Sequence, residues 1–247
     1  RVGEIAPFQV MVILARALEA AGRSIIHMEI GEPDFTTPEP VRAAGARAVG
    51  QGNIFYTPAP GMPELRRAIA GFYRTRYGVE LSADRVIVTT GASGALLLAM
   101  ATLVNPGDEV LLADPGYPAN RNFVHLVNGI PVGVAVGPDS NYQLHCGHLE
   151  QHWGSRTVAA LAATPSNPTG TLLAPDELHA MAQFAADRDG ALIVDEIYHG
   201  LVYEETAKTA LALRDDVFVI NSFSKYFNMT GWRLGWAVVP ERYIDAV

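Results

Sequence analysis

Six short apolar runs recur from residue 86 onward, and helical patterns separate several of them. The runs are four to six residues long and rich in β-branched side chains, and they cover residues 86–90, 109–113, 131–136, 158–163, 191–194 and 217–221. Helical patterns cover residues 93–104, 118–128 and 175–189. Strands that alternate with helices predict a mostly parallel sheet, and uninterrupted hydrophobicity is typical of strands covered on both faces. We therefore expect an α/β fold in which helices sandwich the sheet.

A seventh apolar run, residues 234–239, follows the sixth after a short connection. Too few residues separate the two runs for an ordinary helical crossover, which leaves an antiparallel seventh strand open. Before residue 86 the pattern predicts helices at residues 7–21, 39–50 and 63–77 and a short strand at residues 25–30.

Composition narrows the possible classes of protein. Hydrophobic residues make up 49% of the 247 positions, enough for a large core, and the net charge of −8 argues against a general nucleic-acid surface. The single cysteine, Cys146, cannot form an intrachain disulfide, lies in a loop-like stretch and is expected to be inert. No leader pattern opens the sequence and no apolar run is long enough for a membrane span, so a cytoplasmic protein is expected.

Small and polar residues follow the first two predicted strands. The segment Thr89-Thr90-Gly91-Ala92-Ser93-Gly94 lets an anion approach the backbone, and the helix after it presents free N–H groups. An ordinary tight turn explains the same residues. The segment Asp114-Pro115-Gly116-Tyr117-Pro118 places Tyr117 on a rigid turn, where its ring can cover a planar ligand or simply pack within the loop.

Two later strand ends carry polar side chains as well. Asn167, in Thr164-Pro165-Ser166-Asn167-Pro168-Thr169-Gly170, can donate to a ligand oxygen, although these residues are also turn formers. Asp195 ends an apolar strand, and a carboxylate at that depth needs a partner, such as a protonated pyridine nitrogen, unless it caps the next segment. Tyr198 lies three residues later and can turn toward the same pocket.

The sixth strand leads into Ser222-Phe223-Ser224-Lys225, and Gly231-Trp232-Arg233 follows. An arginine can bind a dianion with its planar fork of donors, and a lysine among phosphate-binding groups suggests an amine that reacts with an aldehyde cofactor. Solvated polar residues at a strand end are the alternative. The ligand that unites all these strand ends is pyridoxal phosphate (PLP). No metal site is expected, because His27, His125, His179 and His199 lack ligand spacing and are read as structural or surface residues.

These segments resemble the class I/II aminotransferases of PLP fold type I, the aspartate aminotransferase superfamily. The matching pieces are Gly31-Glu32-Pro33-Asp34-Phe35, Tyr56 with Gly61, Gly91-Ala92-Ser93, Tyr117, Asn167-Pro168-Thr169-Gly170, Asp195-Glu196-Ile197-Tyr198, Ser222-Phe223-Ser224-Lys225 and Gly231-Trp232-Arg233-Leu234-Gly235. They occur in the family's order along nearly the whole chain. The resemblance implies an N-terminal segment, residues 1–50, that belongs partly to a small domain, and a PLP-binding large domain, residues 51–247, with the C-terminal small domain absent.

The resemblance also implies a role for each residue. Lys225 would hold PLP as an internal aldimine and carry the substrate's α-proton, and Asp195 would keep the pyridine nitrogen protonated. Tyr198 and Asn167 would bond the ring hydroxyl oxygen, and Tyr117 would stack on the ring. The phosphate would be held by residues from two segments, Gly91, Ala92 and Ser93 from the first and Ser222, Ser224 and Arg233 from the second.

Substrate and partner expectations rest on the resemblance too. Gly31 would line the substrate carboxylate pocket together with Asn167, and Tyr56 would reach the phosphate of the neighbouring subunit in a homodimer. The arginine that clamps the substrate carboxylate in the family would lie beyond residue 247. The expected activity is amino transfer between an amino acid and a 2-oxo acid by a ping-pong mechanism.

The sequence leaves several alternatives open. Another PLP enzyme on the same scaffold, such as a carbon–sulfur β-lyase, shares these residues. A PLP-binding regulatory module and a truncated, inert fold are further readings, although no basic helix-turn-helix precedes the first residue. The particular amino acid and oxo acid cannot be read from these residues.

Overall fold

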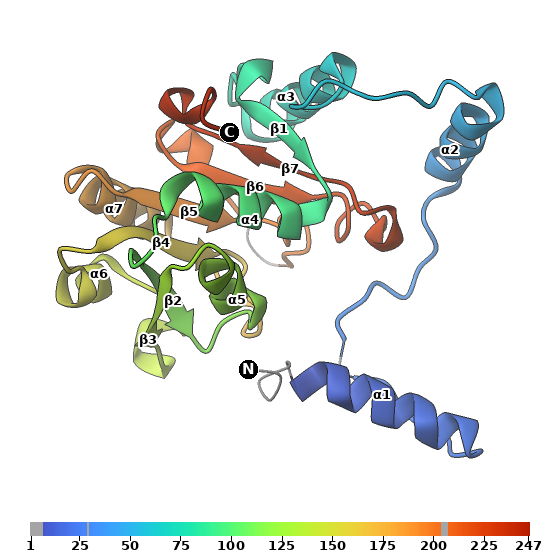
Figure 1. The fold of residues 1–247 in the computed structure, drawn as a ribbon, viewed down its shortest axis with the longest axis horizontal. Coiled ribbons are helices and arrows are strands. Elements are labelled where there is room, and N and C mark those ends of the chain that lie inside the picture. Colours follow the sequence, from blue (N-terminus) through green and yellow to red (C-terminus); the bar gives the residue numbers. More distant parts are fainter. Residues whose placement is uncertain (1–6, 29, 204–206) are drawn as a thin grey trace. The chain divides into compact units, whose positions relative to one another are not determined.

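A seven-stranded sheet forms the centre of the fold in a computed structural model of the chain (Figure 1). The structure describes residues 7–28, 30–203 and 207–247, in two compact units, Arg1–Thr36 and Thr37–Val247. The sheet lies in the second unit, and its strands are β1 (Val86–Thr89), β2 (Glu109–Asp114), β3 (Ile130–Ala135), β4 (Thr157–Ala163), β5 (Ala191–Asp195), β6 (Phe218–Ser222) and β7 (Gly235–Val238). The predicted domain boundary between residues 50 and 51 stays a prediction.

The strand order is β1-β7-β6-β5-β4-β2-β3, and β7 is antiparallel to both of its neighbours. The other four pairings in the sheet are parallel. The mostly parallel sheet and its seven strands are therefore confirmed. The short connection before β7 explains its direction, because a parallel strand would require a longer crossover.

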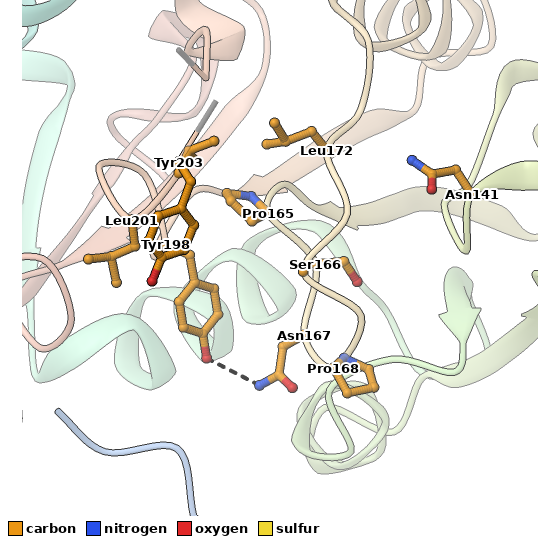
Figure 2. A pocket seen from close by; sticks show the side chains of 11 residues that line it. Asn141, Pro165, Ser166, Asn167, Pro168, Leu172, Tyr198, Leu201 and Tyr203 are labelled. Carbon is orange, nitrogen blue, oxygen red and sulfur yellow. Dashed lines mark hydrogen bonds between the residues drawn. The ribbon is translucent and has the colours of Figure 1, made fainter. Parts of the chain in front are cut away.

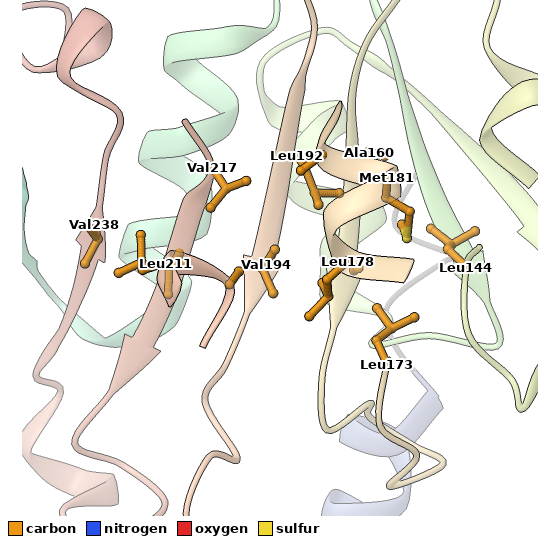
Figure 3. Packing of buried hydrophobic residues seen from close by; sticks show 14 of the residues in the cluster. Leu144, Ala160, Leu173, Leu178, Met181, Leu192, Val194, Leu211, Val217 and Val238 are labelled. Carbon is orange, nitrogen blue, oxygen red and sulfur yellow. The ribbon is translucent and has the colours of Figure 1, made fainter. Parts of the chain in front are cut away.

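Helices cover both faces of the sheet. On one face lie α4 (Gly91–Leu103) and α5 (Ala119–Leu126), and on the other lie α3 (Pro63–Tyr77), α6 (Cys146–His152) and α7 (Pro175–Ala186). Successive strand residues point to opposite faces. Leu192 and Val194 pack with α7 (Figure 3), while Ile193 packs with α4. This double coverage is why the strands read as unbroken apolar runs.

Two of the predicted local structures are wrong. Residues 25–28 form no strand, because a strand needs another strand beside it and none of the described sheet pairings includes this segment. Cys146 is not in a loop but begins helix α6, whose seven residues are too few and too polar to show a helical hydrophobic period. The remaining helices before the sheet, α1 (Pro7–Ala20) and α2 (Glu39–Gln51), match the predicted ranges closely.

The sheet brings distant segments to one edge. Gly235, the first residue of β7, pairs with Thr89 at the end of β1 and with Ser222 at the end of β6. The parallel strands β4 and β5 end in register at the same edge, where Ala163 pairs with Asp195. In open α/β sheets ligands bind at this carboxyl edge. None of the helices in the described ranges combines the length and the hydrophobicity that a membrane crossing requires.

Candidate active site

The first residue of β7 lies in close contact with the start of helix α4. A Cβ atom added to Gly235 would lie 2.6 Å from the carbonyl carbon of Gly91 and 2.8 Å from the amide nitrogen of Ala92. Glycine at position 235 therefore allows β7 to approach the first turn of α4. The amide groups of that turn have no partner within the helix and favour an anion.

Arg233 lies over the same helix terminus. A Cβ atom on Gly91, whose φ is +77°, would come within 2.7 Å of Nη2 of Arg233. The guanidinium also donates from Nη1 to the carbonyl oxygen of Thr230 at 3.0 Å, which holds its orientation. An exposed arginine beside a helix N-terminus supplies both charge and donors for a phosphate.

Two buried serines lie beside the α4 terminus and Arg233 and complete the candidate phosphate site. The Oγ atoms of Ser222 and Ser224 lie 2.8 Å apart, and Ser222 Oγ accepts a hydrogen bond from the Ser224 amide at 3.0 Å. Ser222 Oγ also lies 3.1 Å from the carbonyl oxygen of Leu234. The structure thus gathers the predicted phosphate residues from α4, the end of β6 and the start of β7.

Asp195 is the last residue of β5 and is 8% exposed. Its Oδ1 accepts a hydrogen bond from the backbone amide of Ile197 at 3.1 Å, and no salt bridge reaches it from the described residues. Burial raises the pKa of the Asp195 carboxyl to about 6, against the opposing effect of the Ile197 amide. A carboxyl in this position favours a cationic partner, which would restore its ordinary acidity.

Asn167 and Tyr198 meet beside Asp195. Nδ2 of Asn167 donates to the hydroxyl of Tyr198 at 3.3 Å (Figure 2). The pKa of Tyr198 is raised by burial first and by the Asp195 carboxyl second, so its hydroxyl keeps its proton at neutral pH. The pair forms part of the wall of an open pocket of about 770 Å³, a size that suits a small molecule.

Lys225 and Tyr117 approach the same pair from other strand ends. Nζ of the half-buried Lys225 lies 6.0 Å from the ring centre of Tyr198. Tyr117 and Asn167 line one small cavity of about 50 Å³, and Tyr117 contributes to raising the pKa of Tyr198. Lys225, Tyr117, Asn167 and Tyr198 therefore form one neighbourhood.

For two predicted site residues the structure shows no contact with this neighbourhood, and their roles stay predictions. Tyr56 has a fully exposed side chain on the loop between α2 and α3. Gly31 belongs to the N-terminal unit, so its relation to the sheet edge stays a prediction. Within the described ranges there is no group of three or more His, Cys, Asp or Glu side chains arranged for a metal ion.

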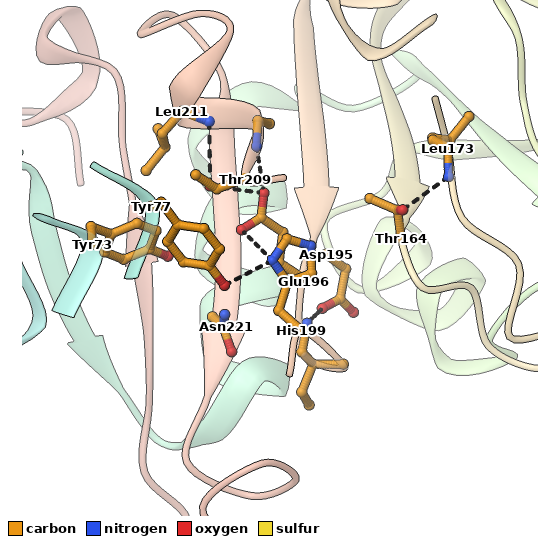
Figure 4. A network of polar contacts seen from close by, with 12 residues as sticks. Tyr73, Tyr77, Thr164, Leu173, Asp195, Glu196, His199, Thr209, Leu211 and Asn221 are labelled. Atoms are coloured by element: carbon orange, nitrogen blue, oxygen red, sulfur yellow. Dashed lines mark hydrogen bonds and ion pairs between the residues drawn. The ribbon is translucent and has the colours of Figure 1, made fainter. Parts of the chain in front are cut away.

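Sequence reasoning missed a buried polar cluster behind Asp195. It contains Glu196, His199, Tyr77 and Thr209 (Figure 4). The sequence contained one signal of this cluster. Glu196 directly follows Asp195 at the end of a buried strand, so its side chain must point to the opposite face of the sheet from Asp195. His199 was read only as a structural or surface histidine, and its burial depends on helix α3, which is distant in the sequence.

Comparisons with known proteins give the relationships of the chain. The model for the family "Aminotransferase class I and II" matches residues 23–247. A valine–pyruvate aminotransferase of Mycobacterium tuberculosis is 40% identical over 96% of this chain and 62% of the relative. A (5-formylfuran-3-yl)methyl phosphate transaminase of Methanocaldococcus jannaschii is 36% identical over 97% of this chain and 63% of the relative.

Solved structures agree with these relationships. An aspartate aminotransferase from Thermus thermophilus with maleate superposes with a TM-score of 0.92 at 32% identity, covering 98% of this chain and 64% of that one. An aminotransferase from Mycobacterium tuberculosis gives a TM-score of 0.82 at 42% identity, covering 88% of this chain and 60% of that one. The chain thus spans less than two thirds of the length of these relatives. It belongs to the class I and II aminotransferase family.

Proposed function

We propose that the protein is a PLP-dependent aminotransferase that moves an amino group between an amino acid and a 2-oxo acid by a ping-pong mechanism. The observation that carries the proposal is the buried Asp195 carboxyl, which shares one sheet edge with the only half-buried lysine. The chain contains two lysines, and the other one, Lys208, is exposed. Burial raises the pKa of the Asp195 carboxyl, and a nearby cation such as a protonated pyridine nitrogen would stabilise its charged form.

The residues present fit the two ends of PLP. The free amides at the start of α4, the Arg233 guanidinium and the paired hydroxyls of Ser222 and Ser224 fit a phosphate. Gly91 and Gly235 leave this space free, because a Cβ on either would meet the guanidinium or the helix backbone. Asp195, Asn167 and Tyr198 fit the nitrogen and the hydroxyl oxygen of the ring.

When bound, PLP supplies an electron sink for the charge that develops at the substrate α-carbon. Lys225 would act as general base and acid, taking the substrate α-proton on Nζ and passing it to the cofactor, which then retains the amino group. Asp195 would hold the proton at the ring nitrogen, and the Tyr198 hydroxyl and the Asn167 amide would bind the ring oxygen. Tyr117 would cover the ring. The phosphate would be held by Gly91, Ala92, Ser93, Ser222, Ser224 and Arg233.

The proposal includes a homodimer and an N-terminal contribution to substrate binding. Three consecutive apolar or aromatic side chains, Ile54, Phe55 and Tyr56, are 68%, 81% and 106% exposed. Such a run is costly to leave in water, which supports its burial against a second copy, with Tyr56 reaching that copy's phosphate. Gly31 would line the substrate carboxylate pocket through its backbone, together with Asn167.

Lys225→Ala, made in the whole protein, tests the proposal. The half-reaction with the best amino acid donor should slow by about 10²-fold or more, because the proton carrier is lost. Borohydride reduction of the PLP-loaded wild type, followed by peptide mass spectrometry, should attach the cofactor to Lys225. Lys208→Ala is the matched control and should keep both the rate and the labelling.

Three outcomes would contradict the proposal. The first is a Lys225→Ala variant that keeps the wild-type rate. The second is labelling of Lys208 in place of Lys225. The third is release of pyruvate and ammonia from cystathionine without an oxo acid acceptor, which would favour a β-lyase.

A further inference from the structure

A cluster of polar side chains is buried directly behind the Asp195–Tyr198 turn, between β5, β6 and helix α3 (Figure 4). Glu196 is completely buried, and its Oε1 accepts hydrogen bonds from the Ala210 amide at 2.7 Å and the Thr209 hydroxyl at 3.1 Å. Its Oε2 lies 3.5 Å from Nδ1 of His199. The same Nδ1 lies 3.0 Å from the hydroxyl of Tyr77, at the end of α3.

Glu196 carries a proton at neutral pH. Burial raises its pKa to about 8, Asp195 adds to that rise, and the hydrogen bonds from Ala210 and Thr209 only partly oppose it. A neutral carboxyl can accept at Oε1 and carry its proton on Oε2, the atom that faces His199 and has no hydrogen bond among the described residues. The neighbouring Asp195 can then ionise without a second negative charge beside it.

His199 is uncharged as well. Its pKa is lowered to about 4, mainly by burial and further by Arg76, while the Thr164 backbone opposes the fall. Tyr77 keeps its proton, because burial and Glu196 raise its pKa to about 12. The groups that face the pair from the surrounding elements are thus Tyr73, Tyr77 and Arg76 on α3 and Asp195 on β5.

The backbone connects this pair to the candidate site. The His199 amide donates to the Glu196 carbonyl at 2.9 Å and closes the turn that contains Tyr198. The Thr164 amide donates to the Asp195 carbonyl at 3.0 Å, so the loop that leads to Asn167 is tied to the same turn. A shift of His199 would therefore move the Tyr198 hydroxyl relative to Asn167.

A second contact holds the far end of the turn. Gly200 has φ +93°, and a Cβ added to it would lie 2.4 Å from the ring of Tyr226, the residue after Lys225. The Arg76 guanidinium lies 4.9 Å from the centre of that ring. Helix α3 thus contacts both the turn, through Tyr77, and the lysine segment, through Arg76.

We propose that Glu196 and His199 are positioning residues, a buried pair that fixes the Asp195–Tyr198 turn and so aims the Asp195 carboxyl and the Tyr198 hydroxyl at the bound cofactor. The proposal rests on the proposed PLP site. It assigns neither residue to proton transfer with the substrate.

The test compares Glu196→Gln, Glu196→Leu, His199→Leu and Tyr77→Phe with the wild type in the whole protein. The readouts are the dissociation constant for PLP and the pH titration of its visible absorption band. Both leucine variants should weaken PLP binding by about tenfold or more and shift the titration midpoint, because small displacements of positioned groups are costly. Glu196→Gln, a neutral isostere that can accept and donate like the protonated carboxyl, should keep both wild-type values.

Tyr77→Phe provides a mild variant that preserves ring packing if a leucine variant does not fold. It should shift the titration midpoint in the same direction as His199→Leu, by a smaller amount. Met181→Val, on the buried face of α7 and away from the turn, is the control for general destabilisation. It should lower the melting temperature and leave the titration unchanged.

Several results would overturn the inference. Leucine variants that bind and titrate PLP as the wild type does would show that the pair does not position the turn. A Glu196→Gln variant that behaves like Glu196→Leu would show that the carboxyl acts as an anion. A wild type that binds no PLP would instead overturn the proposed function, and this inference with it.

Discussion

The guanidinium of Arg233 lies so close to Gly91 that a Cβ on this glycine would come within 2.7 Å of Nη2. Gly91→Ala should therefore displace the arginine from the start of α4, and the positive φ of +77° adds backbone strain. We expect PLP to bind about tenfold or more weakly, since a charged phosphate contact is lost. Equilibrium titration of the cofactor absorbance measures this loss.

Gly71→Ala is the matched control for that substitution. Gly71 lies within α3 and has open space where a Cβ would stand. Alanine there should raise the free energy of unfolding by about 0.5–1 kcal/mol and leave PLP affinity unchanged. Equal PLP affinities for Gly91→Ala and the wild type would contradict the proposed phosphate site at Gly91 and Arg233.

Asn167 and Tyr198 should act as a coupled pair. Tyr198→Phe and Asn167→Ala each remove a hydrogen-bond donor for the ring oxygen, so each should move the titration midpoint of the cofactor band to higher pH. Because the two side chains contact each other at 3.3 Å, the double variant should deviate from the sum by about 0.5–3 kcal/mol. Strict additivity in this double-mutant cycle would show that the two groups act independently.

Glu196 predicts a pH-dependent stability of the cofactor-free protein. Its folded pKa of about 8 exceeds the ordinary value of 4.5, so the folded state binds more protons than the unfolded state between those values. Stability from this group is therefore lost as the pH rises from about 4.5 to 8. Glu196→Gln cannot titrate, and its stability relative to the wild type should increase over this window, by at most about 5 kcal/mol.

Chemical denaturation at several pH values measures that difference. The exposed Glu150→Gln on α6 is the control, and its difference from the wild type should stay flat across the same window. A flat difference for Glu196→Gln would mean that Glu196 is already ionised in the folded protein.

The buried hydrogen bond between Tyr73 and Trp236 should stabilise the contact of α3 with β7. Nε1 of Trp236 donates to the Tyr73 hydroxyl at 3.1 Å. Tyr73→Phe leaves this N–H without its acceptor and should lower the free energy of unfolding by about 1–3 kcal/mol. Tyr243→Phe, whose ring packs on Phe218, is the control and should change stability less. Equal losses would assign the effect to something other than the hydrogen bond.

The fold was predictable where both faces of an element are buried. The run at residues 191–194 appears as β5, Ala191–Asp195, because its neighbours exclude water from every side chain and only apolar residues suit it. The segment 25–30 is also mostly apolar, yet no strand of the sheet pairs with its described residues, and composition alone cannot show whether a strand has a pairing partner. Helix α6 was missed for a different reason, since its seven residues include two histidines and carry no apolar period.

The candidate site was predictable for residues that end strands. Asp195, Asn167 and Lys225 follow apolar runs, and the common direction of parallel strands brings such positions to one edge. The Glu196–His199 pair could not be predicted in the same way. Its proton state follows from burial against Tyr77 and Thr209, and those contacts exist only after α3 and the segment beyond residue 207 have packed.

The double pairing of Gly235 with Thr89 and Ser222 has a consequence for the order of folding. Strand β1 can join the sheet only after β7 has formed, because β7 lies between β1 and β6. Contacts so distant in the sequence form late, since a long loop must close before they stabilise the chain. Pulse-labelled refolding should thus show protection of the β1 amides no earlier than that of β7, and PLP should add protection only afterwards. Bound PLP would therefore stabilise the completed sheet and would not start its assembly.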